Sequence, residues 1–253
     1  MTKQCVCITG STHGIGYAIA EAFAKEGARL VINSHEADTK AAKTLGKMTE
    51  CHFVQADMSS VSGANTFIEN AYGLLGKLDV LVNNAGTFTD VDFDDLEEQM
   101  FDRAYNLNVK GYLFAAKAFS AKVKPEQKGA SIICIGSTNS LAAEKNSVIY
   151  DSSKGAILML VRSLAISLAD RGIRVNGIGP GIVETPLTKL GLDQPGVRAA
   201  LVAQIPLGVI GKPENIGGAA VFLASSNASY ISGQMLYIDG GIIARQLSWD
   251  PMP

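Results

Sequence analysis

Short apolar runs alternate with helical patterns along the whole of this 253-residue chain. Each run is continuously apolar, which is typical of strands in a parallel sheet that is buried on both faces. Strands are predicted at residues 4–9, 29–33, 51–56, 78–82, 131–136, 174–178 and 234–238. Helices are predicted between them, at residues 15–26, 37–47, 62–75, 96–123, 147–169 and 214–224.

This alternation predicts an α/β fold, namely a doubly wound parallel sheet of about seven strands with helices on both faces. No charge run, proline-rich linker or internal repeat divides the chain, so we expect a single domain over residues 1–253. Residues 179–211 form the least regular region and follow the sixth strand, where such a sheet places its ligand crevice. They are expected to cover an active site, or else to form an ordinary surface loop.

The charge and the composition of the chain bear on whether it binds nucleic acid, a membrane or a metal. A net charge of −2 provides no basic footprint, so we expect no nucleic-acid partner. The longest apolar stretch, residues 156–169, is too short to span a bilayer, and no signal-peptide pattern opens the chain. We expect a cytoplasmic protein without a membrane partner. The cysteines and the three histidines are scattered, and no metal site is expected from them.

A glycine-rich turn is predicted between the first strand and the first helix. Gly10, Gly14 and Gly16 lie there, and glycine lets the backbone approach a pyrophosphate at a helix N-terminus. A second turn of small and polar residues, 83–86 (NNAG), directly follows the fourth strand. Such a turn lets backbone approach a flat ring. Both turns belong to the same edge of the predicted sheet.

Tyr150 and Lys154 stand one helical turn apart, so their side chains project from the same helix face. A phenol has a reference pKa of about 10, and an adjacent ammonium favours its ionised form. Such a pair can exchange a proton with an alcohol or carbonyl oxygen. Ser137 ends the fifth predicted strand, at the same edge of the sheet.

Together these motifs resemble those of the short-chain dehydrogenase/reductase family, single-domain type, over nearly the full chain. The resemblance implies a Rossmann-type dinucleotide-binding and catalytic domain, and hydride transfer between NAD(H) or NADP(H) and a small alcohol or ketone. It also implies roles for four residues: Tyr150 is the acid/base, Lys154 lowers its pKa and binds the nicotinamide ribose, Ser137 holds the substrate oxygen, and Asn108 holds a relay water. The family usually has a small residue after the tyrosine; Asp151 stands there, and we expect little effect because it should point away from the phenol.

The same resemblance implies a set of coenzyme contacts. Asp57 would contact the adenine, Asn83 the adenosine side, and Thr185 the nicotinamide carboxamide. The full set is Gly10, Thr12, His13, Gly14, Ile15, Gly16, Ser34, His35, Asp57, Asn83, Ala85, Gly86, Tyr150, Lys154, Pro180, Gly181, Val183 and Thr185.

The choice between the two coenzymes depends on the end of the second strand. NAD-preferring relatives place an acidic residue there, whereas this chain has Ser34. His13 and His35 stand where NADP-preferring relatives often have arginine or lysine, and a partly charged histidine is a weak clamp for a phosphate. NADP is slightly favoured over NAD, and both remain open.

Polar residues around the expected pocket favour a sugar- or polyol-like substrate; they are Thr87, Thr89, Asp90, Asn139, Glu144, Lys145 and Asn146. A 3-oxoacyl-acyl-carrier reductase is the alternative enzyme, and Lys128 and Arg171 are its candidate docking residues. A dinucleotide-binding redox sensor without catalysis is the alternative of another class.

Two further expectations concern assembly. Residues 149–169 carry apolar side chains around most of the predicted helix, which favours a homo-oligomer, a tetramer as in the resembling family. The C-terminal residues 242–253 include Trp249 and are expected to be ordered, because large apolar side chains are costly to leave in water.

Overall fold

A parallel sheet of seven strands, in the order β3-β2-β1-β4-β5-β6-β7, forms the centre of the protein in a computed structural model that describes residues 3–245. Every neighbouring pair of strands runs parallel, which confirms the predicted doubly wound fold. The strands are β1 Cys5–Ile8, β2 Arg29–Ser34, β3 Cys51–Gln55, β4 Val80–Asn83, β5 Ser131–Ile135, β6 Arg174–Pro180 and β7 Met235–Ile238. Each lies within about two residues of its predicted range, the usual uncertainty of element ends.

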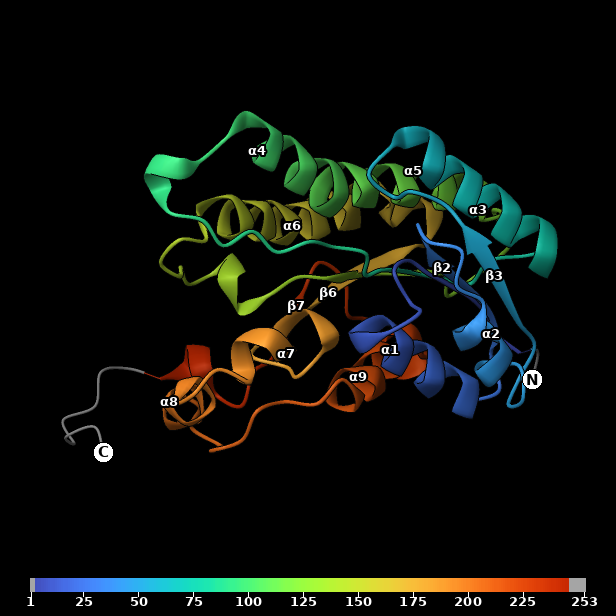
Figure 1. The fold of residues 1–253 in the computed structure, drawn as a ribbon. Helices are drawn as coiled ribbons and strands as arrows, with labels where there is room; N and C mark the ends of the chain where they lie inside the picture. The colour runs from blue at the N-terminus through green and yellow to red at the C-terminus, as the bar shows by residue number, and fades with distance from the viewer. Residues whose placement is uncertain (1–2, 246–253) are drawn as a thin grey trace.

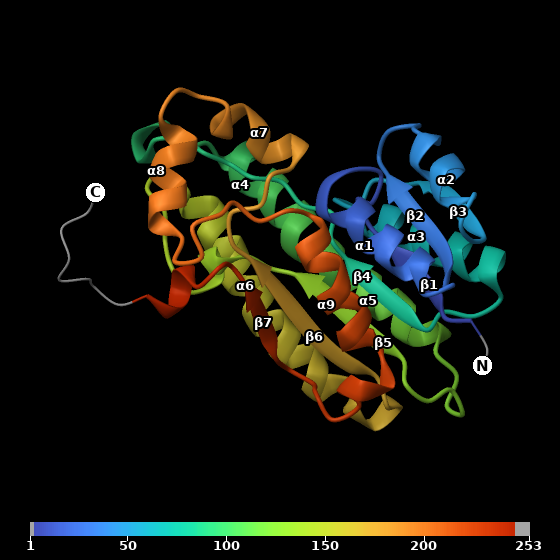
Figure 2. The same cartoon turned by 90° about the horizontal axis from the view of Figure 1, so that it is seen from below.

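Helices cover both faces of this sheet (Figure 1). They are α1 Gly14–Lys25, α2 Lys40–Leu45, α3 Val61–Leu75, α4 Glu98–Tyr105, α5 Gly111–Lys122, α6 Val148–Ser167, α7 Pro186–Leu192, α8 Val197–Gln204 and α9 Glu214–Ala224. On one face α3, α5 and α6 pack, and on the other α1, α2 and α9. Figure 2 shows the second of these layers, with α1 and α9 in front of the strands. None of the helices within residues 3–245 combines the length and apolar character that crossing a membrane would need.

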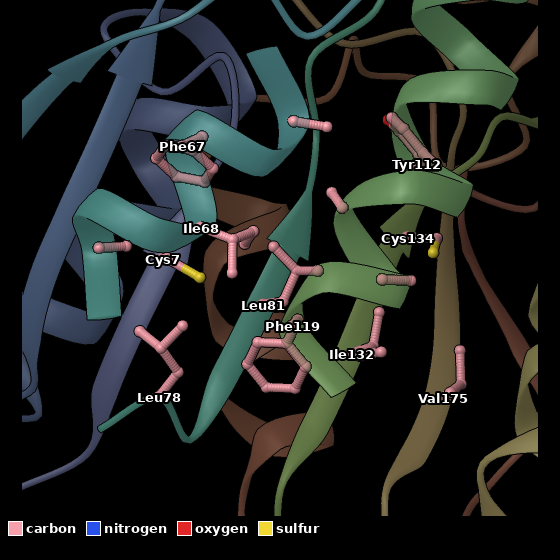
Figure 3. Close-up of a cluster of buried hydrophobic side chains, with 14 of the residues drawn as sticks. Cys7, Phe67, Ile68, Leu78, Leu81, Tyr112, Phe119, Ile132, Cys134 and Val175 are labelled. Carbon is pink, nitrogen blue, oxygen red and sulfur yellow. The ribbon is translucent and has the colours of Figure 1, made fainter. Parts of the chain in front are cut away.

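Two hydrophobic clusters hold these layers, because consecutive strand residues point to opposite faces. In β1, Cys5 and Cys7 belong to the cluster under α3, α5 and α6, and Val6 and Ile8 to the one under α1 and α9. Figure 3 shows the first cluster, in which α3 and α5 side chains meet those of the strands. All four cysteines are free thiols, and burial raises the pKa of Cys51 to about 11.

The structure corrects the sequence prediction in two places. Residues 96–123 do not form one helix, since a π-helical turn, Asn106–Lys110, separates α4 from α5. Residues 179–211 are less irregular than expected, because they contain α7 and α8. Proline at the first position of α7 and a Thr185–Thr188 capping box explain why a helix begins in that region.

The C-terminal prediction can be followed only in part. A short 3-10 helix, Ile242–Ala244, continues the chain after β7. Residues 246–253, including Trp249, lie outside the described residues.

Candidate active site

A cleft of about 640 Å³ runs along the carboxyl ends of the strands, over the point where the strand order reverses between β1 and β4. Open α/β sheets bind their ligands at such a switch point. Most of the residues that the sequence singled out line it. From the predicted set these are Gly10, Thr12, His13, Gly14, Ile15, Gly16, Ser34, His35, Asp57, Ala85, Gly86, Ser137, Tyr150, Lys154, Pro180, Gly181, Val183 and Thr185.

The glycine turn after β1 has the backbone that its sequence predicts. Gly10 and Gly14 have φ of 57° and 58°, a region that favours glycine. A Cβ at Gly10 would lie 2.7 Å from Cα of Ala85, so the two turns touch backbone to backbone. His13 caps α1 without a side-chain hydrogen bond among the described residues, and no acidic residue occupies the first turn. The first amides of α1 therefore face the cleft with the positive end of the helix dipole, a suitable cradle for a diphosphate.

Asn84 and Asn33 hold the glycine turn in place. Nδ2 of Asn84 donates to the carbonyl oxygens of Thr9 (3.1 Å) and Gly10 (2.6 Å). On the opposite side, Oδ1 of Asn33 accepts from the Gly10 amide at 3.2 Å, and its Nδ2 donates to the Ala56 carbonyl at 3.0 Å. Both asparagines line the cleft, although neither was among the predicted contacts. Their sequence signal is an asparagine at or just after the end of a parallel strand.

The far end of the cleft, at β2 and β3, carries Ser34 and Asp57. Oδ1 of Asp57 accepts from the Ser59 amide at 2.9 Å, and this hydrogen bond lowers the pKa of Asp57, so its carboxylate stays ionised. Ser34 accepts from the Glu36 amide at 3.1 Å. Glu36 and Asp38 also line the cleft here, two carboxylates that the sequence argument on coenzyme choice did not consider.

Asn83 does not line the cleft with its neighbours. Its side chain is fully buried below the β4 turn, where Nδ2 donates to the Tyr112 carbonyl at 3.1 Å. Its Oδ1 has no hydrogen-bond partner within the described part of the chain. The Asn83 side chain thus joins β4 to α5, rather than reaching the adenosine side as expected.

Tyr150 and Lys154 lie on one face of α6, as their spacing predicts. Nζ of Lys154 lies 5.4 Å from the centroid of the Tyr150 ring and donates to the Ile135 carbonyl at 3.1 Å. Phe88 contacts the phenol ring edge-on, with ring centroids 4.9 Å apart. The hydroxyl-bearing ring therefore has a buried ammonium and an aromatic side chain as neighbours.

The ionisation of this pair differs from the expectation. Burial raises the pKa of Tyr150 to about 12, and the negative charges of Glu144 and Asp151 act in the same direction, while the Ser137 hydroxyl offsets part of the shift. Burial lowers the pKa of Lys154 to about 8. The sequence argument predicts a phenol pKa below the reference value, through the adjacent ammonium. The pKa of Tyr150 is raised instead, because desolvation is the largest effect on the buried ring.

Asn108 lies within the π-helical turn and is fully buried. Its Oδ1 accepts from the Thr87 amide at 2.9 Å, and its Nδ2 donates to the Thr87 carbonyl (3.1 Å) and to Oγ of Ser153 (3.0 Å). The side chain thereby connects the β4 turn to α6, one position before Lys154. A π-turn widens the helix locally and is frequent at functional sites.

Ser137 follows β5 and lines the cleft beside Tyr150. Its Oγ accepts from the Asn139 amide at 3.1 Å and donates to Oδ1 of Asn139 at 2.9 Å. Of the polar residues expected around the pocket, Thr87 lines the cleft. The Asn139 side chain instead hydrogen-bonds the side chains of Ser137 and Asp151. The Val91 amide donates to the Asn146 carbonyl at 3.0 Å. This hydrogen bond brings the segment with Thr89 and Asp90 beside the segment with Glu144 and Lys145.

Comparison with known proteins agrees with this geometry. A family model described as "Enoyl-(Acyl carrier protein) reductase" matches residues 10–243. The chain is 36% identical to glucose 1-dehydrogenase 2 of Bacillus subtilis, over 96% of this chain and 95% of that protein. It is 32% identical to the L-rhamnose 1-dehydrogenase (NAD(P)(+)) of Azotobacter vinelandii, with 96% and 97% covered. The crystal structure of a putative short-chain alcohol dehydrogenase from Sinorhizobium meliloti 1021 superposes with a TM-score of 0.92 at 31% identity, covering 96% and 98%.

Proposed function

The chain belongs to the short-chain dehydrogenase/reductase family, and we propose that it is an NAD(P)-dependent oxidoreductase for a polyhydroxylated alcohol such as a sugar or polyol. The observation that carries this proposal is that Ser137, Tyr150 and Lys154 line the same cleft as the glycine turn of α1. Relatives named as glucose and rhamnose dehydrogenases support the polar substrate class.

A dinucleotide fits the residues that line the cleft. The uncapped first turn of α1 would bind the diphosphate, Asp57 the adenine, and Lys154 and Thr185 the nicotinamide half. When bound, the coenzyme supplies a carbon that accepts or donates a hydride. The protein contributes position, exclusion of water and proton transfer.

Proton transfer falls to Tyr150. Its phenolate would take the proton of the substrate alcohol in oxidation, and the hydroxyl so formed would return the proton to the carbonyl oxygen in reduction. Lys154 places a buried positive charge beside the ring, which stabilises the phenolate as it forms. Ser137 would hydrogen-bond the substrate oxygen at the same point. The buried Asn108 would hold the proton-relay water next to Lys154.

The acyl-carrier reductase remains the alternative enzyme, but its docking residues are poorly located. Lys128 precedes β5 and Arg171 precedes β6, so both lie toward the amino ends of the strands. The cleft opens at the carboxyl ends, on the opposite edge of the sheet. A redox sensor without catalysis would have no use for a complete set of proton-transfer residues, which favours an enzyme.

The direct test is a panel of aldoses, polyols, simple alcohols and 3-oxoacyl thioesters, assayed with saturating NAD(H) or NADP(H) by the absorbance of the reduced nicotinamide. Turnover should be fastest with one of the sugars or polyols. Faster reduction of an acyl thioester would favour the alternative enzyme. Coenzyme binding without turnover of any of these substrates would overturn the proposal.

We further propose a cytoplasmic homotetramer in which residues 1–253 act as one catalytic domain. Apolar side chains on the outer face of α6 support the assembly: Met159 is 55% and Ile166 81% exposed. For the coenzyme we propose a slight preference for NADP, supported by Ser34 where an NAD-binding acid would stand.

A further inference from the structure

The carbonyl of Ile135, the last residue of β5, lies beyond the end of the hydrogen-bond ladder between β4 and β5. The Gly136 amide donates to the Ile178 carbonyl in β6 at 2.7 Å, and in a trans peptide the Ile135 carbonyl points the opposite way, toward β4. β4 ends at Asn83, which pairs with Cys134, so this strand stops one residue short of Ile135. The Ile135 carbonyl is therefore available to side chains.

Two buried side chains donate to this one oxygen. Nζ of Lys154 on α6 lies 3.1 Å from it, and the hydroxyl of Tyr112 on α5 lies 3.3 Å from it. Lys154 is 5% exposed and Tyr112 is 2% exposed. A carbonyl oxygen has two lone pairs, so the two donors together fill it. One backbone oxygen thus links Lys154 to a second phenol, which the proposed reaction does not use.

Tyr112 is fixed in this place by its surroundings. Its own carbonyl accepts from Nδ2 of Asn83 at 3.1 Å, and its side chain belongs to the cluster between α5 and the sheet, together with Cys134 (Figure 3). Burial raises the pKa of Tyr112 well above its ordinary value. The phenol therefore keeps its proton and remains a permanent donor to the Ile135 carbonyl.

Two donors on one acceptor weaken each other. Each presents the positive end of an N–H or O–H bond to the same oxygen, so these positive ends also face one another and repel. The Tyr112 proton occupies electron density that would otherwise stabilise the ammonium. Lys154 is therefore held less firmly than it would be if the Ile135 carbonyl had no second donor.

We propose that Tyr112 is a positioning residue for Lys154: its hydroxyl shares the Ile135 carbonyl and so leaves the ammonium free to turn to the coenzyme ribose and to Tyr150. An ammonium carries three N–H donors, and Lys154 lines the cleft while it bonds Ile135. The part of this inference that concerns the coenzyme rests on the proposed function of the site.

The principal variant is Tyr112→Phe, which removes the hydroxyl and keeps the ring. Lys154 still donates to the Ile135 carbonyl in this variant, so no buried acceptor is left unpaired and the fold should survive. The pKa of Lys154 should rise by about 0.5 to 1, the equivalent of one net hydrogen bond. NMR titration of the lysine side chains in the coenzyme-free protein measures this pKa, and Lys154→Met assigns the signal.

The pH profile of alcohol oxidation provides an independent readout. The ionisable groups that face the Tyr150–Lys154 pair are Asp151 on α6, Glu144 in the loop before α6, Cys134 on β5 and Tyr112 on α5. Burial raises the pKa of Cys134 to about 12 and lowers that of Lys154 to about 8. Tyr112→Phe changes none of the other groups. The pH at which the oxidation kcat levels off should therefore move upward with the pKa of Lys154.

Coenzyme affinity is a further readout. A more firmly held Lys154 should raise the coenzyme dissociation constant of Tyr112→Phe about two- to tenfold. Tyr72→Phe on α3 is the matched control, because it also removes a hydroxyl and keeps the ring, which Lys122 contacts at 5.2 Å. Tyr72 is not among the residues that line the cleft, so its variant should leave the Lys154 pKa and the coenzyme affinity unchanged.

A double-mutant cycle tests whether the carbonyl is shared. In a Lys154→Met background, Tyr112 is the remaining donor to Ile135, so Tyr112→Phe leaves the buried carbonyl without a partner. The melting temperature should therefore fall further in this background than in wild type. Tyr112→Met removes the same hydroxyl with a different side chain, and it repeats the titration if Tyr112→Phe folds poorly.

Three results would each overturn the inference. They are a Lys154 pKa that is unchanged or lowered in Tyr112→Phe, equal losses of melting temperature in the two backgrounds, and a coenzyme dissociation constant that does not rise. A wild type that turns over no alcohol or carbonyl compound would instead overturn the proposed function. The titration and the melts would still decide the role of Tyr112, because neither needs substrate or coenzyme.

Discussion

At the scale of single residues, the reactivity of the site depends on how the protein surrounds one phenol. Tyr150 has the ammonium of Lys154 and the ring of Phe88 as neighbours. Burial raises the pKa of Tyr150 to about 12 and lowers that of Lys154 to about 8, so each charged form is disfavoured. The phenol is therefore protonated at neutral pH and ready to donate to a carbonyl oxygen.

Tyr150→Phe tests this role most directly. The substitution removes one hydroxyl and keeps the ring, so packing against Phe88 should survive. Turnover should fall by about 10²–10⁴, the usual contribution of a positioned acid/base. Coenzyme affinity and melting temperature serve as controls and should stay close to wild type. A correctly folded variant with near-full turnover would contradict the assignment.

The pH dependence of alcohol oxidation follows from the raised pKa of Tyr150. Phenolate is the base in this direction, and it is scarce well below a pKa of about 12. With saturating coenzyme, kcat should therefore rise with pH between about 6 and 8, and level off above the Lys154 pKa of about 8, where the charge that stabilises the phenolate is lost. Carbonyl reduction uses the protonated phenol, which stays almost fully populated below about pH 9, so its kcat should change little. An oxidation kcat that does not rise with pH would exclude Tyr150 as the titrating group.

Ser34→Asp tests the coenzyme preference at the end of β2. A new carboxylate would repel a 2′-phosphate and accept a hydrogen bond from a 2′-hydroxyl, so the ratio of kcat/KM for NADP to that for NAD should fall at least about tenfold. Ser34→Asn is the matched control, similar in shape but neutral. Wild type that strongly prefers NAD would show that Glu36 and Asp38, which line the same part of the cleft, already supply the negative charge.

At the scale of elements, the coenzyme cradle depends on how closely two turns approach. A Cβ at Gly16 would collide with the Gly10 carbonyl and with Nδ2 of Asn84. The turn after β1 and the turn after β4 therefore tolerate no side chain between them. The hydrogen bonds of Asn84 to Thr9 and Gly10 depend on this approach.

Gly16→Ala should lower both the melting temperature and the affinity for coenzyme, because the turn must open to admit a methyl group. Gly73→Ala is the matched control, at an exposed position of α3 where a Cβ would meet nothing within 4 Å. There the same change should stabilise the protein by about 0.5–1 kcal/mol. Thermal melts and coenzyme titrations of both variants check this. Equal behaviour of the two would refute the close-packed turn.

At the scale of the whole molecule, α6 carries both the Tyr150–Lys154 pair and an exposed apolar face. Ile157 and Val161 of this helix are buried against the sheet, whereas Met159 and Ile166 are largely exposed. An apolar outer face on the helix that carries Tyr150 and Lys154 favours a contact with a second subunit.

Analytical ultracentrifugation at micromolar concentration should accordingly report a tetramer. Ile166→Glu places a charge on the exposed face and should lower the assembled mass, while Thr44→Glu, at an exposed polar position of α2 on the other face of the sheet, should not. A wild type that sediments as a monomer would reject the assembly.

The sequence alone determined those features that depend on local spacing. Strand and helix alternation was sufficient for the seven-stranded sheet, since apolar continuity and helical periodicity are properties of short segments. Gly10 and Gly14 could be recognised because a turn with positive φ selects glycine. Tyr150 and Lys154 could be paired because one helical turn separates them.

Tertiary structure alone decided what depends on contacts between distant segments. Asn108 lies in a π-helical turn that the apolar periodicity of the sequence did not predict. The Asn83 side chain lies away from the cleft and donates a hydrogen bond to the Tyr112 carbonyl in α5. The raised pKa of Tyr150 results from desolvation by several elements together, which no single segment encodes. Asp151 reaches Ser137 through Asn139 because the loop after β5 folds back onto α6. Such contacts arise only once the whole chain is packed, so spacing along the sequence could not reveal them.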